Sequence, residues 1–164
     1  MRMNQILPLL IVLIQFFGNT KAIYGADFQK GVEAYNNSDY LTALREWAPL
    51  GKDGDADVQY NLGVMYDLGQ GVPKDYKIAA KWYKLASEQG HANAQAALGQ
   101  MHQKGEGVPK NLIRAYMWIS IAVSAGVKYA DEAKDILVKN LSSSEIITAQ
   151  KLARECVRKG YKKC

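Results

Sequence analysis

The sequence predicts an all-α fold, a right-handed α-solenoid of antiparallel helix pairs with a cap at each end. We expect about eight helices after a signal peptide. Three observations support this fold class. A segment of the chain recurs after 36 residues, each copy holds two stretches in which apolar residues have helical spacing, and a Gly/Pro-rich break separates those stretches.

The internal repeat covers residues 56–91 and 92–127. At least thirteen identities recur at the single offset of 36 residues, which chance does not explain. A period of this length is typical of stacked arrays, which work mainly by presenting a surface. In the first copy the identities are Ala56, Leu62, Gly63, Met65, Gly69, Gly71, Val72, Pro73, Lys74, Ala79, Trp82, Ala86 and Gly90.

The first 22 residues are predicted to be a secretory signal peptide. Residues 6–17 form an apolar run, and the residues after it are small and polar, which favours cleavage after Ala22. Cleavage near Gly25 or Ala26 and an uncleaved signal anchor are the alternatives. Because the run is short for a transmembrane helix, we expect an exported chain, periplasmic or secreted, without a stable membrane span.

A shorter unit, residues 23–55, precedes the repeats and is predicted to be an N-terminal partial or capping repeat. Its helices are expected near 27–36 and 40–50, and its turn lacks four residues of the Gly-rich segment. Its acids Asp27, Glu33, Glu46 and Asp55 show no paired spacing and are expected on solvated faces.

Each full repeat is predicted to hold two helices, which in the first copy cover residues 56–68 and the stretch from Asp75 to about Ser87. Asp75 and, in the second copy, Asn111 are the expected N-caps of the second helices. The intervening glycines are expected in left-handed turn conformations. A phosphate-binding loop is the alternative, but this turn follows a helix and lacks a Lys-Ser/Thr pair.

Residues 128–164 are predicted to form a C-terminal helical cap, with helices near 128–139 and 143–159. Ser142 and Glu145 have the spacing of a capping box. With both terminal faces covered, we expect a monomer.

The two cysteines, Cys156 and Cys164, are predicted to form a disulfide, because their number is even and the chain is expected to be exported. Gly160 permits the chain reversal that this bond needs. A buried free cysteine with a frayed tail thiol is the alternative. The basic residues of the tail indicate either contact with anionic envelope polymers and lipid headgroups or a solvated helix end; they are Arg154, Arg158, Lys159, Lys162 and Lys163.

The repeats resemble the SEL-like repeat family, relatives of the tetratricopeptide repeats, in their exported bacterial type. The residues that carry the resemblance are Ala56, Gln59, Leu62-Gly63, Tyr66, Gly69-x-Gly71-Val72, Asp75, Ala79, Trp82, Ala86 and Gly90. The second copy departs from the pattern mainly at His102, which replaces Tyr66, and at Asn111-Leu112, which replaces Asp75-Tyr76. The resemblance implies helix pairs and adaptor roles.

The resemblance to tetratricopeptide arrays also implies that the first helix of each pair lines a concave face. The partner-binding positions expected there are Asp57, Tyr60, Val64, Asp67, Asn93, Gln100, Gln103, Phe28 and Tyr35. This face is aromatic at one end and rich in amides at the other, which suits an extended peptide or a helix. Alternatively, Phe28 and Tyr35 only seal the core of the first unit.

The sequence predicts no catalytic residues, cofactor or metal, and no nucleic-acid partner. It contains neither G-x-S-x-G nor Ser-x-x-Lys, and His91 and His102 are too far apart to share a metal, so both are expected to be structural. We therefore expect a non-catalytic scaffold or adaptor that binds a peptide or protein of the cell envelope. The alternatives are a regulatory or inhibitory subunit of an envelope enzyme and a hydrolase acting on β-lactams or peptidoglycan.

Overall fold

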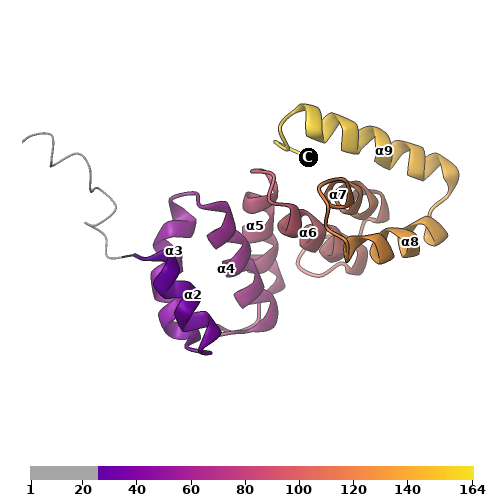
Figure 1. Cartoon of the computed structure of the whole chain (residues 1–164). Coiled ribbons are helices and arrows are strands. Elements are labelled where there is room, and N and C mark those ends of the chain that lie inside the picture. Colours follow the sequence, from indigo (N-terminus) through magenta and orange to yellow (C-terminus); the bar gives the residue numbers. More distant parts are fainter. Residues whose placement is uncertain (1–25) are drawn as a thin grey trace, which may run out of the picture.

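The computed structural model describes residues 26–164, so the predicted signal peptide lies outside the described residues. In the described part, eight α-helices and no strand follow one another from one end of an elongated molecule to the other (Figure 1). The predicted all-α solenoid is confirmed. The helices are α2 (Phe28–Asn36), α3 (Tyr40–Lys52), α4 (Ala56–Leu68), α5 (Tyr76–Ser87), α6 (Ala92–Lys104), α7 (Leu112–Ser124), α8 (Ala130–Asn140) and α9 (Ser143–Arg158).

Most of these helices begin at a polar side chain that accepts a hydrogen bond from a backbone N–H of the first turn. Such caps satisfy donors that have no partner within the helix. The predicted caps Asp75 and Asn111 are confirmed, and Ser142 and Glu145 form both halves of the predicted capping box. The capping residues are Asp27, Asp39, Asp55, Asp75, His91, Asn111 and Ser142. None of the helices between residues 26 and 164 is both long enough and apolar enough to cross a membrane.

The Gly-rich turn of each repeat uses left-handed backbone. Gly69 and Gly105 end the first helices with φ angles of 74° and 80°. Two residues further on, Gly71 and Gly107 both have a φ of 70°. A Cβ atom on Gly107 would also overlap the backbone carbonyl of Tyr76 in the preceding repeat. The turn therefore needs glycine both for its conformation and for this close approach, which confirms the turn interpretation.

Each helix pair is closed by the same contact, in which a glycine of the first helix lies beneath a large side chain of the second helix. A Cβ atom added to Gly63 would lie only 2.5 Å from ring atom Cδ1 of Tyr83. The large side chains are 36 residues apart, so the N-terminal unit is built like a repeat although its turn is shorter. The three pairs are Gly31 with Trp47, Gly63 with Tyr83 and Gly99 with Ile119.

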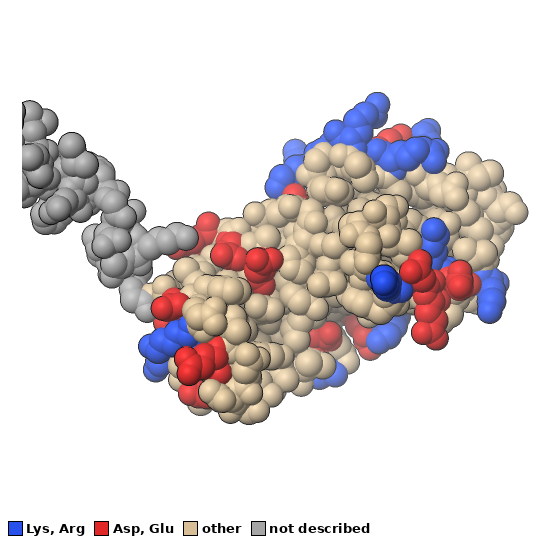
Figure 2. Space-filling view, viewed as in Figure 1, with Lys and Arg blue, Asp and Glu red and all other residues tan. Residues whose placement is uncertain are grey.

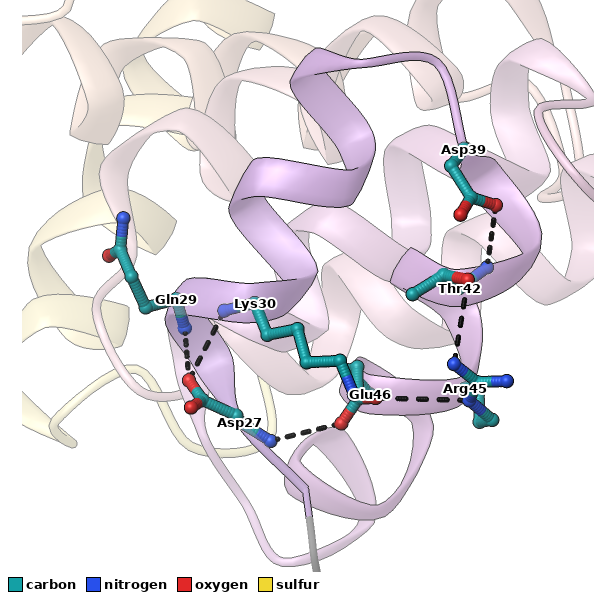
Figure 3. Close-up of polar contacts among 7 residues, drawn as sticks. All are labelled: Asp27, Gln29, Lys30, Asp39, Thr42, Arg45 and Glu46. Carbon is teal, nitrogen blue, oxygen red and sulfur yellow. Dashed lines mark hydrogen bonds and ion pairs between the residues drawn. The ribbon is translucent and has the colours of Figure 1, made fainter.

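The N-terminal unit is held by an ion-pair centre at Glu46 of α3 (Figure 3). Glu46 is only 4% exposed, Nζ of Lys30 lies 2.7 Å from its Oε1, and the backbone N–H of Asp27 donates to its Oε2 at 3.3 Å. The hydrogen bond from Lys30 is the largest of the effects that hold the pKa of Glu46 below its usual range. The expected solvated position of Glu46 is wrong, because α2 packs over this side of α3.

Helix α7 is covered at the C-terminal end of the array. It packs against α6, α8 and α9, and residues 115–119 are all buried. Met117, which stands where α5 has the exposed Lys81, is 2% exposed. The cap helices therefore provide the cover that an apolar second helix requires.

The chain end is tied back onto α9 by a disulfide between Cys156 and Cys164, whose Cα atoms are 5.4 Å apart. Gly160, with a φ of 60°, reverses the chain, and the N–H of Tyr161 donates to the carbonyl of Cys156 at 2.9 Å. The predicted disulfide is confirmed. It fixes the basic tail against the body of the protein.

Charge is distributed unevenly along the solenoid. Residues 26–91 carry ten acidic and seven basic side chains, whereas residues 92–164 carry six acidic and twelve basic side chains. Figure 2 shows basic side chains gathered over α9 and acidic ones where α3 leads into α4. The molecule therefore has an acidic and a basic end.

Gly63→Ala should destabilise the protein although alanine is the better helix former. The added methyl group meets the buried ring of Tyr83, and overpacking should outweigh the propensity gain, lowering the free energy of unfolding by about 1–2 kcal/mol. Urea unfolding followed by circular dichroism measures this, with the exposed position Glu33→Ala as the control. An unchanged or higher stability of Gly63→Ala would show that the contact is loose.

Replacing both Cys156 and Cys164 by serine should lower the free energy of unfolding by about 2–3 kcal/mol, because the unfolded chain loses a short closed loop. Urea unfolding of the double variant and of the wild type with and without reductant measures the loss. The free energy of unfolding of the reduced wild type should lie within about 1 kcal/mol of that of the double variant. We expect the remaining difference to come from the serine that replaces the buried Cys156.

Candidate binding surface

The predicted binding residues lie on the first helices of the three units, and we call them the first-helix surface. Phe28, Asp57 and Asn93 are exposed, and the others are half-buried, so none is lost to the core. The members are Phe28 and Tyr35 on α2; Asp57, Tyr60, Val64 and Asp67 on α4; and Asn93, Gln100 and Gln103 on α6.

The centre of this surface is a stack of two rings, one on α4 and one at the N-cap of α6. The ring of Tyr60 on α4 lies 4.6 Å from the imidazole of His91, with 22° between the planes. The ring of Tyr83 on α5 lies 5.8 Å from Tyr60 on a tilted plane. Nε2 of His91 is 3.3 Å from Oδ1 of Asp57, whose side chain is 75% exposed. His91 therefore contacts two of the predicted residues, Tyr60 through its ring and Asp57 through Nε2. Tyr83 packs on the ring of Tyr60.

His91 is held in one protonation state by its neighbours. Its Nδ1 accepts a hydrogen bond of 3.1 Å from the N–H of Ala94, as the N-cap of α6. The remaining proton must then be on Nε2, where it faces Asp57. Burial lowers the pKa of His91, and the nearby carboxylate of Asp57 offsets this only in part. His91 is thus neutral, with its ring fixed at both nitrogens.

The carboxyl end of α4 continues the surface. The hydroxyl of Tyr83 donates to Oδ2 of Asp67 at 3.4 Å, and burial is the main reason that the pKa of Tyr83 is raised. Asp67 and Gln100 both line a small polar cavity of about 190 Å³, together with Lys74 and Lys104. Residues predicted separately on α4 and α6 are therefore brought together here.

At the N-terminal end, Tyr35 has two roles. Its ring centre lies 5.5 Å from that of Trp47, so it does seal the core of the first unit. Its hydroxyl also donates to Oε1 of Gln70 at 2.7 Å, in the Gly-rich turn of the next unit. Phe28 is 39% exposed, and its carbonyl accepts from the indole N–H of Trp47 at 3.3 Å. The alternative role in the core thus holds for Tyr35, while the ring of Phe28 stays accessible.

At the C-terminal end, Tyr129 extends the surface beyond α6. It is 54% exposed, and its hydroxyl donates to Oδ1 of Asn93 at 3.3 Å. Partial burial raises the pKa of Tyr129, and the nearby phenol of Tyr60 raises it further. Val64 packs against the central core, and Gln103 is half-buried. The aromatic part of the surface therefore spans more of the array than the sequence predicts.

Tyr83, His91 and Tyr129 are the residues of this region that were not predicted, and the ring of Tyr83 is buried beside that of Tyr60. The structural role expected for His91 is real, since it caps α6, but its ring also completes the stack. Comparison of equivalent positions could have found two of them. Tyr83 corresponds to Ile119, and His91 stands one repeat after Asp55. An aromatic residue that is present in only one copy of the repeat could therefore have indicated these two positions.

The arrangement suits recognition better than catalysis. Both nitrogens of His91 are engaged, so neither is available as a general base for a substrate. No group of three or more His, Cys, Asp or Glu residues in the described range is placed to hold a metal ion. What the surface offers is ring faces, carboxylates and amides, which bind by stacking and hydrogen bonding.

The helix pairs define the protein as an α-solenoid repeat protein, and the first-helix surface is a face of aromatic, acidic and amide side chains. The family model described as Sel1 repeat matches residues 56–91 and 92–127. The chain therefore contains two Sel1 repeats. No curated protein matches the sequence.

The solved structures that are similar to the chain include the following two. One is c5321, a protective antigen that is present in uropathogenic Escherichia coli strains and displays an SLR fold. It is 25% identical to this chain with a TM-score of 0.74, and the match covers 80% of this chain and 30% of that chain. The other is a Sel1 repeat protein from Oxalobacter formigenes, with 30% identity and a TM-score of 0.66 over 79% of this chain and 55% of that chain. This chain thus spans less than two thirds of either relative.

His91 should make stability depend on pH. Because its pKa in the folded state lies below the ordinary 6.5, the unfolded chain takes up a proton first as the pH falls. Its contribution to stability is complete above about pH 6.5 and is lost as the pH falls through the lowered folded pKa.

Asn is an N-cap that does not titrate, so His91→Asn should gain stability relative to the wild type between about pH 7 and pH 5. Urea unfolding at several pH values measures this difference. A difference in the free energy of unfolding that stays constant with pH would contradict the lowered pKa of His91. Burial also lowers the pKa of His102, but this residue is present in both proteins, so its effect cancels.

Proposed function

We propose that the protein is an exported, non-catalytic scaffold that binds a peptide or protein of the cell envelope across the first-helix surface. The observation that carries this proposal is the stack of Tyr60 on His91 beside the exposed Asp57, which links α4 to the start of α6 in one accessible feature. Its ring geometry is set before any partner arrives, so binding costs little ordering of these side chains.

The residues around the stack support a peptide ligand. Tyrosine presents a large, rigid contact area and is frequent among the residues that dominate binding energy. The partly exposed rings of Tyr35, Tyr60 and Tyr129 come from α2, from α4 and from the residue before α8, and the imidazole of His91 stacks on the ring of Tyr60. They therefore form a track from the first unit to the C-terminal cap, with a length that suits an extended segment or a helix.

The charges on this track indicate the chemistry of the partner. Asp57 and Asp67 flank Tyr60 on α4, and the amides of Asn93 and Gln100 follow on α6. A segment with Lys or Arg side chains between apolar ones would pair with the carboxylates and stack on the rings. The amides would accept and donate hydrogen bonds to its backbone.

Export is supported by two independent features. The disulfide between Cys156 and Cys164 is of a kind that persists in oxidising compartments. The first 22 residues have the composition of a signal peptide. Non-catalytic action is supported by the fully engaged His91 and by the Sel1 repeats, which generally serve as scaffolds.

Site-specific photo-crosslinking in the producing cell tests the proposal. A photoreactive phenylalanine analogue at Asn93 should give a discrete protein adduct, whereas the same analogue at Ile147, which is 64% exposed on α9, should not. Tyr60→Ala should weaken the Asn93 adduct several-fold, because it removes the central ring.

Asp57→Lys provides a second variant that leaves the core untouched, since Asp57 is exposed, and it should weaken the adduct similarly. Circular dichroism confirms that each variant is folded. Equal adducts from Asn93 and Ile147, or an adduct insensitive to both substitutions, would reject this surface.

A further inference from the structure

A second groove lies on the opposite side of the array. It has a volume of about 680 Å³ and is formed by α5, α6, α7, the second Gly-rich turn and the disulfide-tied tail. Leu98 and His102 of α6 line it, and at 100° per residue these point away from Asn93 and Gln100 of the first-helix surface. The two surfaces are therefore separate.

The rim of this groove is strongly basic, and its basic groups are largely unpaired. Lys77, Lys81 and Lys84 of α5 are exposed, and none of them forms an ion pair within residues 26–164. Arg114 of α7 and Lys163 of the tail stand on the other side. The guanidinium of Arg114 donates to the backbone carbonyl of Cys164, which holds the tail in place. Against these cations the groove has a single acidic side chain, Glu88.

The floor between the charged walls is apolar. Ala80, Leu98 and Trp118 lie beneath it and are at most 5% exposed. Val108 is half-buried and Pro109 is exposed, so both present apolar surface to the groove. A ligand that only neutralised the lysines would leave this apolar surface exposed to water. The ligand that fits must bring apolar groups together with its negative charges.

The spacing of the cations distinguishes a linear ligand from a compact one. Lys77, Lys81 and Lys84 follow one face of α5, and the first and last are about 10 Å apart along the helix axis. A single phosphate headgroup would reach only part of such a row. A peptide in the extended polyproline II conformation advances about 3.1 Å per residue and has three residues per turn, so acidic side chains three residues apart lie on one face, about 9 Å from each other, and match the two ends.

We propose that this basic groove binds an extended acidic peptide segment, with carboxylates about three residues apart and apolar side chains between them. The carboxylates pair with the lysines of α5 and with Lys163, and the apolar side chains rest on Val108 and Pro109. The disulfide is part of the site, because it holds the tail that forms one wall.

Fluorescence anisotropy with a labelled eight-residue peptide tests this inference, with glutamates three residues apart and leucines between them. The peptide should bind the purified protein, more weakly as salt is raised, and the matching peptide with glutamine for each glutamate should not bind. Lys77→Glu with Lys84→Glu should lower the affinity at least tenfold. The matched double variant, Lys139→Glu with Lys151→Glu, reverses two exposed charges on α8 and α9 and should change it less than twofold.

Four outcomes would overturn the proposal: no binding of the glutamate peptide, equal binding of both peptides, equal loss in the two double variants, or lysine-dependent binding only to vesicles containing an anionic phospholipid. Tyr60→Ala should leave the affinity for this peptide unchanged, which separates this groove from the first-helix surface. Circular dichroism of each variant shows whether it is folded.

Discussion

The structure depends on one close contact, a glycine on the first helix of each unit that lies directly beneath a large side chain of the second. Trp47, Tyr83 and Ile119 occupy the same place in three successive units. The absence of a side chain on the glycine lets the two helices approach, and the ring or branched chain fills the space that remains. Successive pairs can then stack with the same geometry. In the first full repeat the packing side chain stays buried, but the hydroxyl of Tyr83 donates to Asp67 of the first-helix surface.

The local parts of this fold could be predicted from sequence, since the evidence for them is local. Helix bounds, the caps Asp75 and Asn111 and the left-handed glycines follow from spacing and from the chemistry of single residues. The disulfide followed from the number of cysteines and from Gly160. The repeat itself supplied the order of the helices.

Contacts that differ between repeats were harder to predict. Glu46 has no counterpart in the full repeats from which its ion pair with Lys30 could be inferred. Its burial results from the packing of α2 against α3, which the sequence pattern does not show. His91 stands where Asp55 caps the preceding unit, and spacing alone did not show that the imidazole would also reach Tyr60. The predicted first-helix positions are accessible, but the rings that organise them come from α5 and from the residue before α8.

The recurrent glycine contact has a consequence for how such a chain changes over evolutionary time. Because one unit presents to the next the same shape that it receives, a whole 36-residue unit could be duplicated or deleted between residues 91 and 92 without creating a new kind of interface. The terminal helices would have to be kept, since only they have an outer face suited to water. Array length is therefore a property that the gain or loss of whole units can adjust.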